Sequence, residues 1–190
     1  MLMLSKTRPF LIPLDKSNSG HGDTLLYGYR FALEHGADYI FQTDSDGQTN
    51  PDEFERFWKL RHRYDSIFGN RIKRGDGRNR AVIERVLCII LFVIFGVKLP
   101  DANAPFRLMR ADYVEKYLKL IPKHFNLPNV LLTSFGVYYH DRVKFIPISF
   151  KSRQGGKNSM NIRKISRIGF YAVRDFLVIR RKCKNIHGRL

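Results

Sequence analysis

Apolar residues repeat with a helical period in some segments and with a strand-like period in others. Residues 23–35 place Leu25, Leu26, Tyr29, Ala32 and Leu33 on one face, which predicts a helix that ends at Gly36. The next run, ADYIFQTD at residues 37–44, is short and rich in β-formers. It predicts a buried strand that ends near Asp44.

A helix-start signal follows this strand. Asn50 can accept a hydrogen bond from the first turn, Pro51 suits the first helical position, and Glu53 can reach back as in a capping box. We therefore expect a helix from Pro51 to about Arg63.

The remaining pattern alternates between the two periods. It predicts a strand over 65–71 that breaks at Gly69, an exposed basic loop over 72–80, a helix over 80–96, a short strand over 106–109, a helix over 111–121 and a last strand over 142–150. Pro147 favours an edge position for the last strand, because proline cannot donate a ladder hydrogen bond. This alternation favours the α/β fold class.

The C-terminal segment combines apolar and basic residues. Its apolar positions near helical spacing are Ile162, Ile165, Ile168, Ala172, Phe176 and Ile179, with arginines among them. This composition predicts a helix that lies in a membrane interface, with its apolar side in lipid. We therefore divide the chain into a domain over 1–160 and a basic amphipathic tail over 161–190. The longest apolar run, Val86 to Val97, is shorter than the roughly 20 residues that span a bilayer.

The net charge of the chain limits the kinds of partner that it is expected to bind. Of its 190 residues, 34 are Lys or Arg and 17 are Asp or Glu, which gives a net charge of +17. Such an excess favours an anionic partner, and nucleic acid, an anionic membrane surface and a nucleoside-diphosphate sugar all qualify. Cys88 and Cys183 have no metal-ligand spacing, so we expect a reducing cytoplasmic environment.

Two carboxylates stand where the first strand should end. Asp44 and Asp46 would repel each other unless a cation lies near them, and Mg²⁺ or Mn²⁺ prefers such oxygen ligands. Gln48 could complete the protein side of the coordination shell, and open positions would then accept phosphate oxygens. The alternative is a solvated turn, since Asp-Gly is a common turn dipeptide. These residues alone favour the turn.

Four stretches of the chain together resemble a known family. They are NSGHGDTLLYGYRFALEHGADYIFQTDSDGQTNPDEF, IFGNRIKR, GVKLPDANAPFRLMR and FKSRQGGKNSM, and they cover most of residues 18–160. In order and spacing they are similar to family 2 glycosyltransferases, in particular the dolichol-phosphate mannosyltransferase-like branch. The resemblance implies a partial GT-A fold, with a mostly parallel sheet flanked by helices. It also implies transfer of a sugar, with inversion, from a nucleoside-diphosphate sugar to a polyprenyl phosphate or surface-glycan acceptor.

The resemblance also assigns roles to residues of the donor side. Asp44 and Asp46 match the metal-binding DXD motif, and Gln48 matches a metal-contacting glutamine, so the implied cofactor is Mg²⁺ or Mn²⁺. Arg71 matches an arginine near the donor diphosphate, where a guanidinium can stabilise the leaving group. Asn18 and Gly20, in the first of the four stretches, are assigned to substrate binding.

On the acceptor side the resemblance leaves alternatives open. Asp101 matches an aspartate near the acceptor that could take a proton from an acceptor hydroxyl. A polyprenyl phosphate is already anionic and needs no base, and Asp101 would then organise its loop. Arg153 and Lys157 resemble a basic segment that closes over phosphate, and the alternative for them is an ordinary mobile surface loop.

Two motifs of the family are missing from the chain: a proline-tyrosine-asparagine-glutamate-like turn and an aspartate-aspartate-glycine-serine-like motif. Both hold the donor nucleotide, so we expect an N-terminally truncated domain whose sheet has an uncovered edge. A second chain could supply the missing strands. We expect a peripheral position at the inner face of the membrane. The competing hypotheses are a nucleic-acid-binding module and an inactive glycosyltransferase remnant.

Overall fold

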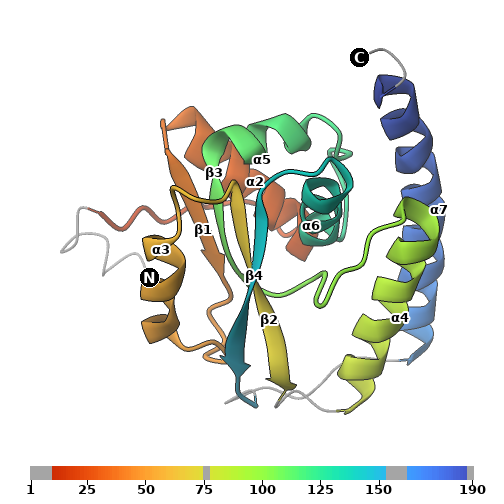
Figure 1. Ribbon diagram of the computed structural model, residues 1–190, viewed down its shortest axis with the longest axis horizontal. Coiled ribbons are helices and arrows are strands. Elements are labelled where there is room, and N and C mark those ends of the chain that lie inside the picture. Colours follow the sequence, from red (N-terminus) through yellow and green to blue (C-terminus); the bar gives the residue numbers. More distant parts are fainter. Residues whose placement is uncertain (1–9, 75–77, 153–161, 188–190) are drawn as a thin grey trace.

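The computed structural model describes residues 10–74, 78–152 and 162–187, which alternate between helices and strands (Figure 1). The helices are α2 (His21–Glu34), α3 (Phe54–Lys59), α4 (Arg78–Phe95), α5 (Ala111–Leu118), α6 (Pro128–Tyr138) and α7 (Ile162–His187), with a short 3-10 helix η1 (Pro51–Glu53) before α3. The strands are β1 (Tyr39–Thr43), β2 (Ser66–Arg74), β3 (Phe106–Arg110) and β4 (Val143–Phe150). The predicted α/β class is confirmed.

The strands form one mixed sheet in the order β1-β3-β2-β4. β3 runs antiparallel to both β1 and β2, while β2 and β4 are parallel. The expected mostly parallel sheet is therefore corrected, because β3 lies in the middle and opposes the other three strands. Since β1, β2 and β4 share one direction, their carboxyl ends meet at one edge of the sheet.

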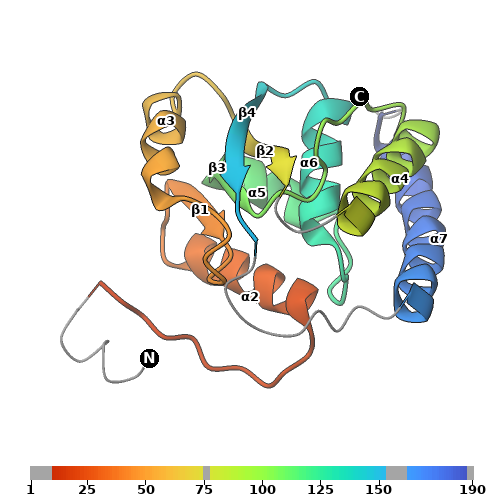
Figure 2. The ribbon, with the colours of Figure 1, turned by 90° about the horizontal axis from the view of Figure 1, so that it is seen from below.

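Helices cover the two faces of the sheet unequally (Figure 2). On one face α3 packs over a small cluster that includes Phe57, Phe106 and Leu108. On the other face the larger core lies between the sheet and helices α2, α5 and α6, with α4 and α7 at its margin. Burial of these apolar side chains is the main favourable contribution to folding.

Most of the predicted elements are confirmed, with small shifts at their ends. α2 begins at His21 and is followed by Gly36, whose φ of 72° suits the residue after a helix. β1 covers Tyr39–Thr43, so Asp44 follows it as expected. β4 lies at the edge of the sheet, which confirms the prediction from Pro147.

The predicted helix from Pro51 to Arg63 is shorter and is divided in two. The Asn50 side chain accepts from the Asp52 N–H at 3.3 Å, which confirms the predicted cap. The capping box is wrong, because the Glu53 carboxylate instead accepts from the backbone N–H and the hydroxyl of Ser149 at 3.1 and 2.8 Å. Glu53 therefore ties this segment to β4.

Strand β2 does not break at Gly69 and continues to Arg74. A Cβ at Gly69 would lie 2.6 Å from Ile148 Cδ1 and 3.0 Å from the carbonyl oxygen of Phe106. The glycine therefore lets the neighbouring strands approach within the sheet. Because of this continuation, and because α4 begins at Arg78, the basic loop predicted over 72–80 is shorter than expected.

The tail forms α7, but the apolar side that the structure describes faces protein. Ala172, Phe176 and Ile179 are buried in the larger core, so the lipid contact predicted for these three side chains is corrected. Arg180 donates to the carbonyl of Ile94 at 3.1 Å and ties α7 to α4. Among the described residues, no helix is long and apolar enough to cross a membrane.

Candidate functional site

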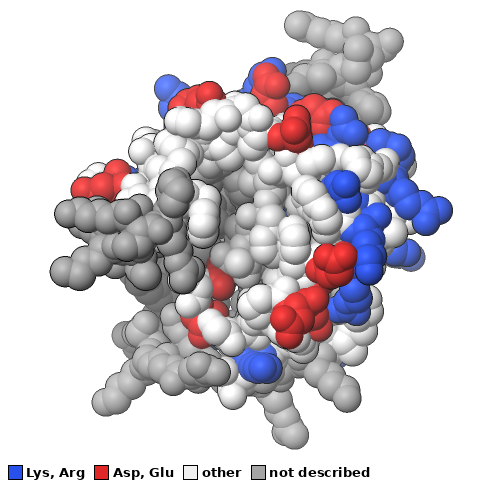
Figure 3. All heavy atoms as spheres, turned by 90° about the vertical axis from the view of Figure 1, so that its left-hand side faces the viewer, with Lys and Arg blue, Asp and Glu red and all other residues white. Residues whose placement is uncertain are grey.

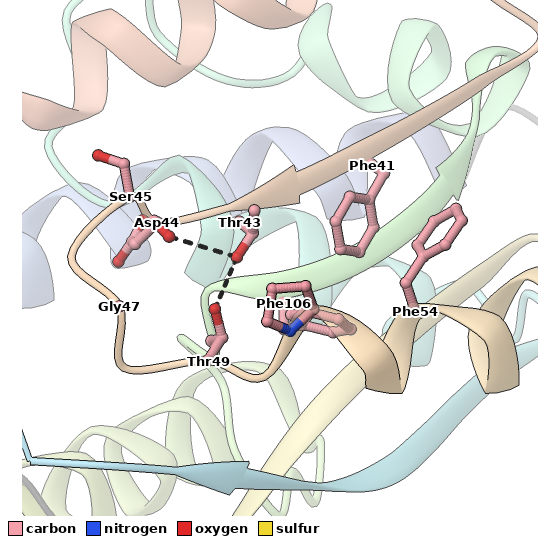
Figure 4. A pocket seen from close by; sticks show the side chains of 9 residues that line it. Phe41, Thr43, Asp44, Ser45, Gly47, Thr49, Phe54 and Phe106 are labelled. Atoms are coloured by element: carbon pink, nitrogen blue, oxygen red, sulfur yellow. Dashed lines mark hydrogen bonds between the residues drawn. The ribbon is translucent and has the colours of Figure 1, made fainter.

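The Asp-Ser-Asp loop begins where β1 ends. Thr43 is the last strand residue, and its hydroxyl lies 2.9 Å from that of Thr49, so the two side chains close the loop (Figure 4). Within the loop, the Asp46 carboxylate accepts from the Gln48 N–H at 3.2 Å, and Gly47 takes a φ of 74°. This closed turn holds two carboxylates at the carboxyl edge of the sheet, where ligands of open α/β sheets bind.

The electrostatic surroundings of Asp44 favour a cation beside it. Burial raises the pKa of the Asp44 carboxyl, the nearby His21 side chain lowers it, and the Asp46 carboxylate raises it again. Burial and Asp46 therefore disfavour the charged form of the Asp44 carboxyl, and a cation beside the loop would favour it. Hard carboxylate oxygens fit Mg²⁺ or Mn²⁺.

Gln48 is buried and holds the loop against the end of β4. Its side-chain Nε2 donates to the carbonyl of Lys151 at 2.9 Å, and the Lys151 N–H donates to the carbonyl of Gln48 at 2.8 Å. The loop is thereby joined to the residues that precede Arg153. No cluster of three or more His, Cys, Asp and Glu side chains suited to a metal occurs in the described part of the chain. The ligands expected from the sequence are two carboxylates and one amide.

A hollow of about 560 Å³ lies beside this loop. Its lining consists of Phe41, Thr43, Asp44, Ser45, Gly47, Thr49, Pro51, Phe54 and Phe106. The Phe41 ring meets the rings of Phe54 and Phe106 edge to face, with centroids 4.7 Å apart in both pairs. Figure 3 shows a hollow lined mainly by uncharged atoms, with acidic atoms beside it and Lys and Arg side chains along one side of this face. An aromatic hollow next to carboxylates suits a ligand that has a flat apolar part and a charged part.

A second cluster joins three elements close to the first. The Arg71 guanidinium on β2 binds the Asp101 carboxylate through Nε at 2.6 Å and through a terminal nitrogen at 2.8 Å. The same guanidinium lies 3.3 Å from Glu84 of α4. Glu84 also accepts from the backbone N–H groups of Ala102 and Asn103 at 2.8 and 3.2 Å. The loop that contains Asp101 is therefore held between β2 and α4.

This cluster contains two residues with predicted roles, Arg71 at the donor diphosphate and Asp101 near the acceptor. The Arg71 side chain is 7% exposed and the Asp101 side chain 3% exposed, and each is engaged with the other. Such a buried, bidentate carboxylate has the geometry expected for a residue that organises its loop, the alternative to the predicted base. Arg71 lies near enough to Asp44 to lower its pKa, so the structure brings the two predicted sites into one neighbourhood.

Sequence reasoning missed Glu84 and Arg107. Glu84 is the one acidic residue of α4, and an acid within such an apolar helix was the available signal. Arg107 is fully buried and donates to the carbonyls of Ala104 and Asn129, at 2.7 and 3.1 Å. Burial lowers its pKa. No local pattern indicated that this strand arginine points inward.

The remaining predicted residues lie at the start of α2 or outside the described residues. Gly20 precedes α2 with a φ of 99°, and its N–H donates to the Asn18 side chain at 3.2 Å. His21, next along the chain, is one of the residues that lower the pKa of Asp44, so the start of α2 lies near the carboxylate loop. Arg153 and Lys157 are outside the described residues.

Fold and site together define an α/β protein with a carboxylate loop and an aromatic hollow at the carboxyl edge of its sheet. No family model matches the chain. The chain is 25% identical over 151 residues to the undecaprenyl-phosphate mannosyltransferase of Micrococcus luteus. The match covers 76% of this chain and 62% of that protein, so the chain spans less than two thirds of its relative's length. This similarity supports a relationship to glycosyltransferases.

Proposed function

We propose that this chain acts in glycosyl transfer from a nucleoside-diphosphate sugar to a polyprenyl phosphate. The observation that carries the proposal is the half-buried Asp44 beside Asp46 at the carboxyl end of β1, in a chain similar to an undecaprenyl-phosphate mannosyltransferase. A surface-glycan acceptor is the alternative within the same reaction class.

The two carboxylates and Gln48 are the groups that would hold Mg²⁺ or Mn²⁺, whose charge offsets that of the leaving diphosphate. The aromatic rings of Phe41, Phe54 and Phe106 offer a flat apolar surface next to this charge. A ligand with a ring system and a diphosphate would place its ring there and its charge toward Asp44.

On the acceptor side, Asp101 positions its loop through Arg71 and Glu84. A polyprenyl phosphate has an anionic oxygen that can attack the sugar directly, so transfer with inversion needs no protein base. This division of labour agrees with the buried, paired state of the Asp101 carboxylate. We further propose that the chain works at the inner face of the membrane, where such an acceptor is anchored.

Thermal unfolding with Mn²⁺ and a panel of nucleoside-diphosphate sugars tests the proposal. Because a ligand that binds only the folded state raises the melting temperature, one donor should give a metal-dependent increase. Asp46→Ala should abolish the increase, whereas Asp52→Ala, an exposed carboxylate nearby, should keep it. A label moved from that donor to polyprenyl phosphate would then establish the reaction. If no donor shifts the melting temperature, this chain by itself does not carry out the transfer.

A further inference from the structure

Helix α4 is apolar on two sides. Its inner side places Leu91 and Phe95 in the core. Its outer side carries Val82, Val86, Ile89 and Val93, four residues at spacings of four, three and four, which are 57, 50, 62 and 76% exposed. Such spacing sets side chains in one row along a helix. We call this row the outer stripe of α4.

The neighbouring helix also carries exposed apolar side chains. α7 lies beside α4 at the side of the molecule opposite to α3 (Figures 1 and 2), and Arg180 ties the two helices through the carbonyl of Ile94. Leu177 and Val178 of α7 are 48 and 46% exposed. Exposed apolar side chains on two neighbouring helices are typical of a docking surface.

The charges around the outer stripe are positive. Arg85 on α4 and Lys98 just after it are exposed, as are Arg174 and Arg181 on α7. The acidic residue of α4, Glu84, is turned inward to Arg71. Asp175 of α7 lines a small pocket together with residues 125–127. The described part of this surface therefore joins aliphatic side chains to cations without an exposed carboxylate between them.

We propose that the outer stripe of α4, together with Arg85 and Lys98, docks onto the surface of an anionic lipid bilayer. The helix would lie in the plane of the interface, with its aliphatic side chains among the acyl chains and its cations at lipid phosphates. A second copy of this chain fits less well, because a two-fold contact would bring the same cations together. The surface differs from the buried side of α7 that the sequence assigned to lipid.

The proposal extends the proposed function and rests on it, because α4 also holds the loop that contains Asp101. Glu84, on the inner side of α4, accepts from the N–H groups of Ala102 and Asn103. With α4 on the bilayer, this loop would lie about one helix diameter, roughly 10 Å, from the lipid surface. A polyprenyl phosphate presents its phosphate at that level.

Sedimentation of the full chain with vesicles tests the proposal. Vesicles of phosphatidylcholine mixed with phosphatidylglycerol should carry the protein down, and vesicles of phosphatidylcholine alone should carry less. The double variant Val86→Gln, Ile89→Gln should bind the anionic vesicles at least about tenfold more weakly, because two aliphatic side chains no longer enter the bilayer. Arg85→Gln should weaken binding roughly fivefold.

Matched controls lie elsewhere on the surface. Tyr27→Gln changes an exposed apolar residue of α2, and Lys59→Gln removes an exposed cation of α3, so both should bind vesicles as the unchanged chain does. Circular dichroism would confirm that the double variant Val86→Gln, Ile89→Gln, called the outer-stripe variant, is folded. Full vesicle binding by that variant would overturn the proposal. The proposal would also be overturned if the unchanged chain forms a dimer and the outer-stripe variant is a monomer that still binds vesicles fully.

Vesicle binding needs no donor sugar, so the two proposals can fail separately. Intact vesicle binding without any sugar transfer would overturn the proposed function alone. Sugar transfer by the outer-stripe variant at the normal rate and with normal vesicle binding would overturn the docking surface alone.

Discussion

Arg71 and Asp101 form a bidentate ion pair between β2 and the loop before β3, with nitrogen–oxygen distances of 2.6 and 2.8 Å. The backbone N–H of Arg71 also donates to the same carboxylate at 3.2 Å. Both side chains are almost fully buried. Without Arg71, Asp101 would be a buried, unbalanced charge, and without Asp101, Arg71 would keep only the longer contact with Glu84 at 3.3 Å.

Asp101→Ala should therefore lower the free energy of unfolding by up to about 3–5 kcal/mol, the range for breaking a buried ion pair from one side, because Glu84 remains as a weaker partner of Arg71. Urea denaturation followed by circular dichroism measures this change. The matched control is Asp112→Ala, which breaks the pair of Asp112 with Arg110, whose side chains are 65 and 37% exposed. That exposed pair should contribute at most about 1 kcal/mol. Equal effects of the two substitutions would contradict a structural role for Asp101.

The raised pKa of Asp44 predicts that removal of its charge stabilises the fold. Burial and the neighbouring Asp46 raise the pKa of Asp44 above its ordinary 3.8, so the folded state binds the proton more tightly than the unfolded state does. Stability contributed by Asp44 is therefore lost as pH rises through its folded pKa. Asp44→Asn should raise the free energy of unfolding at neutral pH, by less than about 1 kcal/mol because solvent screens this partly exposed group.

The pH dependence of this rise in unfolding free energy shows whether it comes from the Asp44 charge or from another effect of the substitution. Urea denaturation at several pH values should show the gain shrink as pH falls toward 3.8, where Asp44 of the unchanged chain is protonated. Asp65→Asn is the control with the opposite sign, because hydrogen bonds from Arg142 hold the pKa of Asp65 below its usual value. It should cost stability at neutral pH, and that cost should disappear as pH falls through the lowered pKa. A pH-independent effect of Asp44→Asn would refute the assignment.

The pair Asp44 and Asp46 shows what the sequence could predict about the site. Asp44 and Asp46 follow a short apolar strand, so their place at a strand end could be inferred from local pattern alone. The partner of Asp101 could not, because Arg71 is 30 residues away and their contact depends on how β2 packs against the loop. The same holds for Glu84, which meets residues 18 and 19 positions further along the chain.

In the fold, too, some elements could be predicted from the local sequence and others could not. α2 and β1 were predicted because one side of each is apolar and the residues that end them are distinctive. α6 was not predicted, because residues 128–136 are all buried and such a helix has no polar side to give a helical period. The direction of β3 also escaped prediction. Pairing is set by contacts between distant strands, and the local alternation of residues is the same in parallel and antiparallel strands.

Glu84 predicts a difference between two substitutions at one position. Glu84→Gln keeps an oxygen that can accept from the Ala102 N–H, whereas Glu84→Ala leaves that buried N–H without its acceptor. The alanine variant should be less stable than the glutamine variant by about 1–3 kcal/mol, the cost of an unsatisfied buried polar group. Urea denaturation measures the difference, and amide hydrogen exchange at Ala102 should quicken in the alanine variant alone. Glu55→Ala, which removes an exposed carboxylate from α3, is the control and should change stability by about 0.5 kcal/mol or less.

Two glycines of α2 should respond to alanine in opposite directions. A Cβ at Gly22 would lie 2.1 Å from the carbonyl oxygen of Phe125 and 2.7 Å from the Cα of Asn126, so the backbone would have to move. Gly22→Ala should cost about 1–3 kcal/mol of unfolding free energy, as overpacking does. At Gly28 a Cβ meets nothing within 4 Å, and Gly28→Ala should stabilise the helix by about 0.5–1 kcal/mol. Since Gly22 lies one residue after His21, Gly22→Ala should also weaken any donor-induced rise in melting temperature, while Gly28→Ala should leave it intact. Equal stability of the two variants would show that α2 does not approach residues 125–126 this closely.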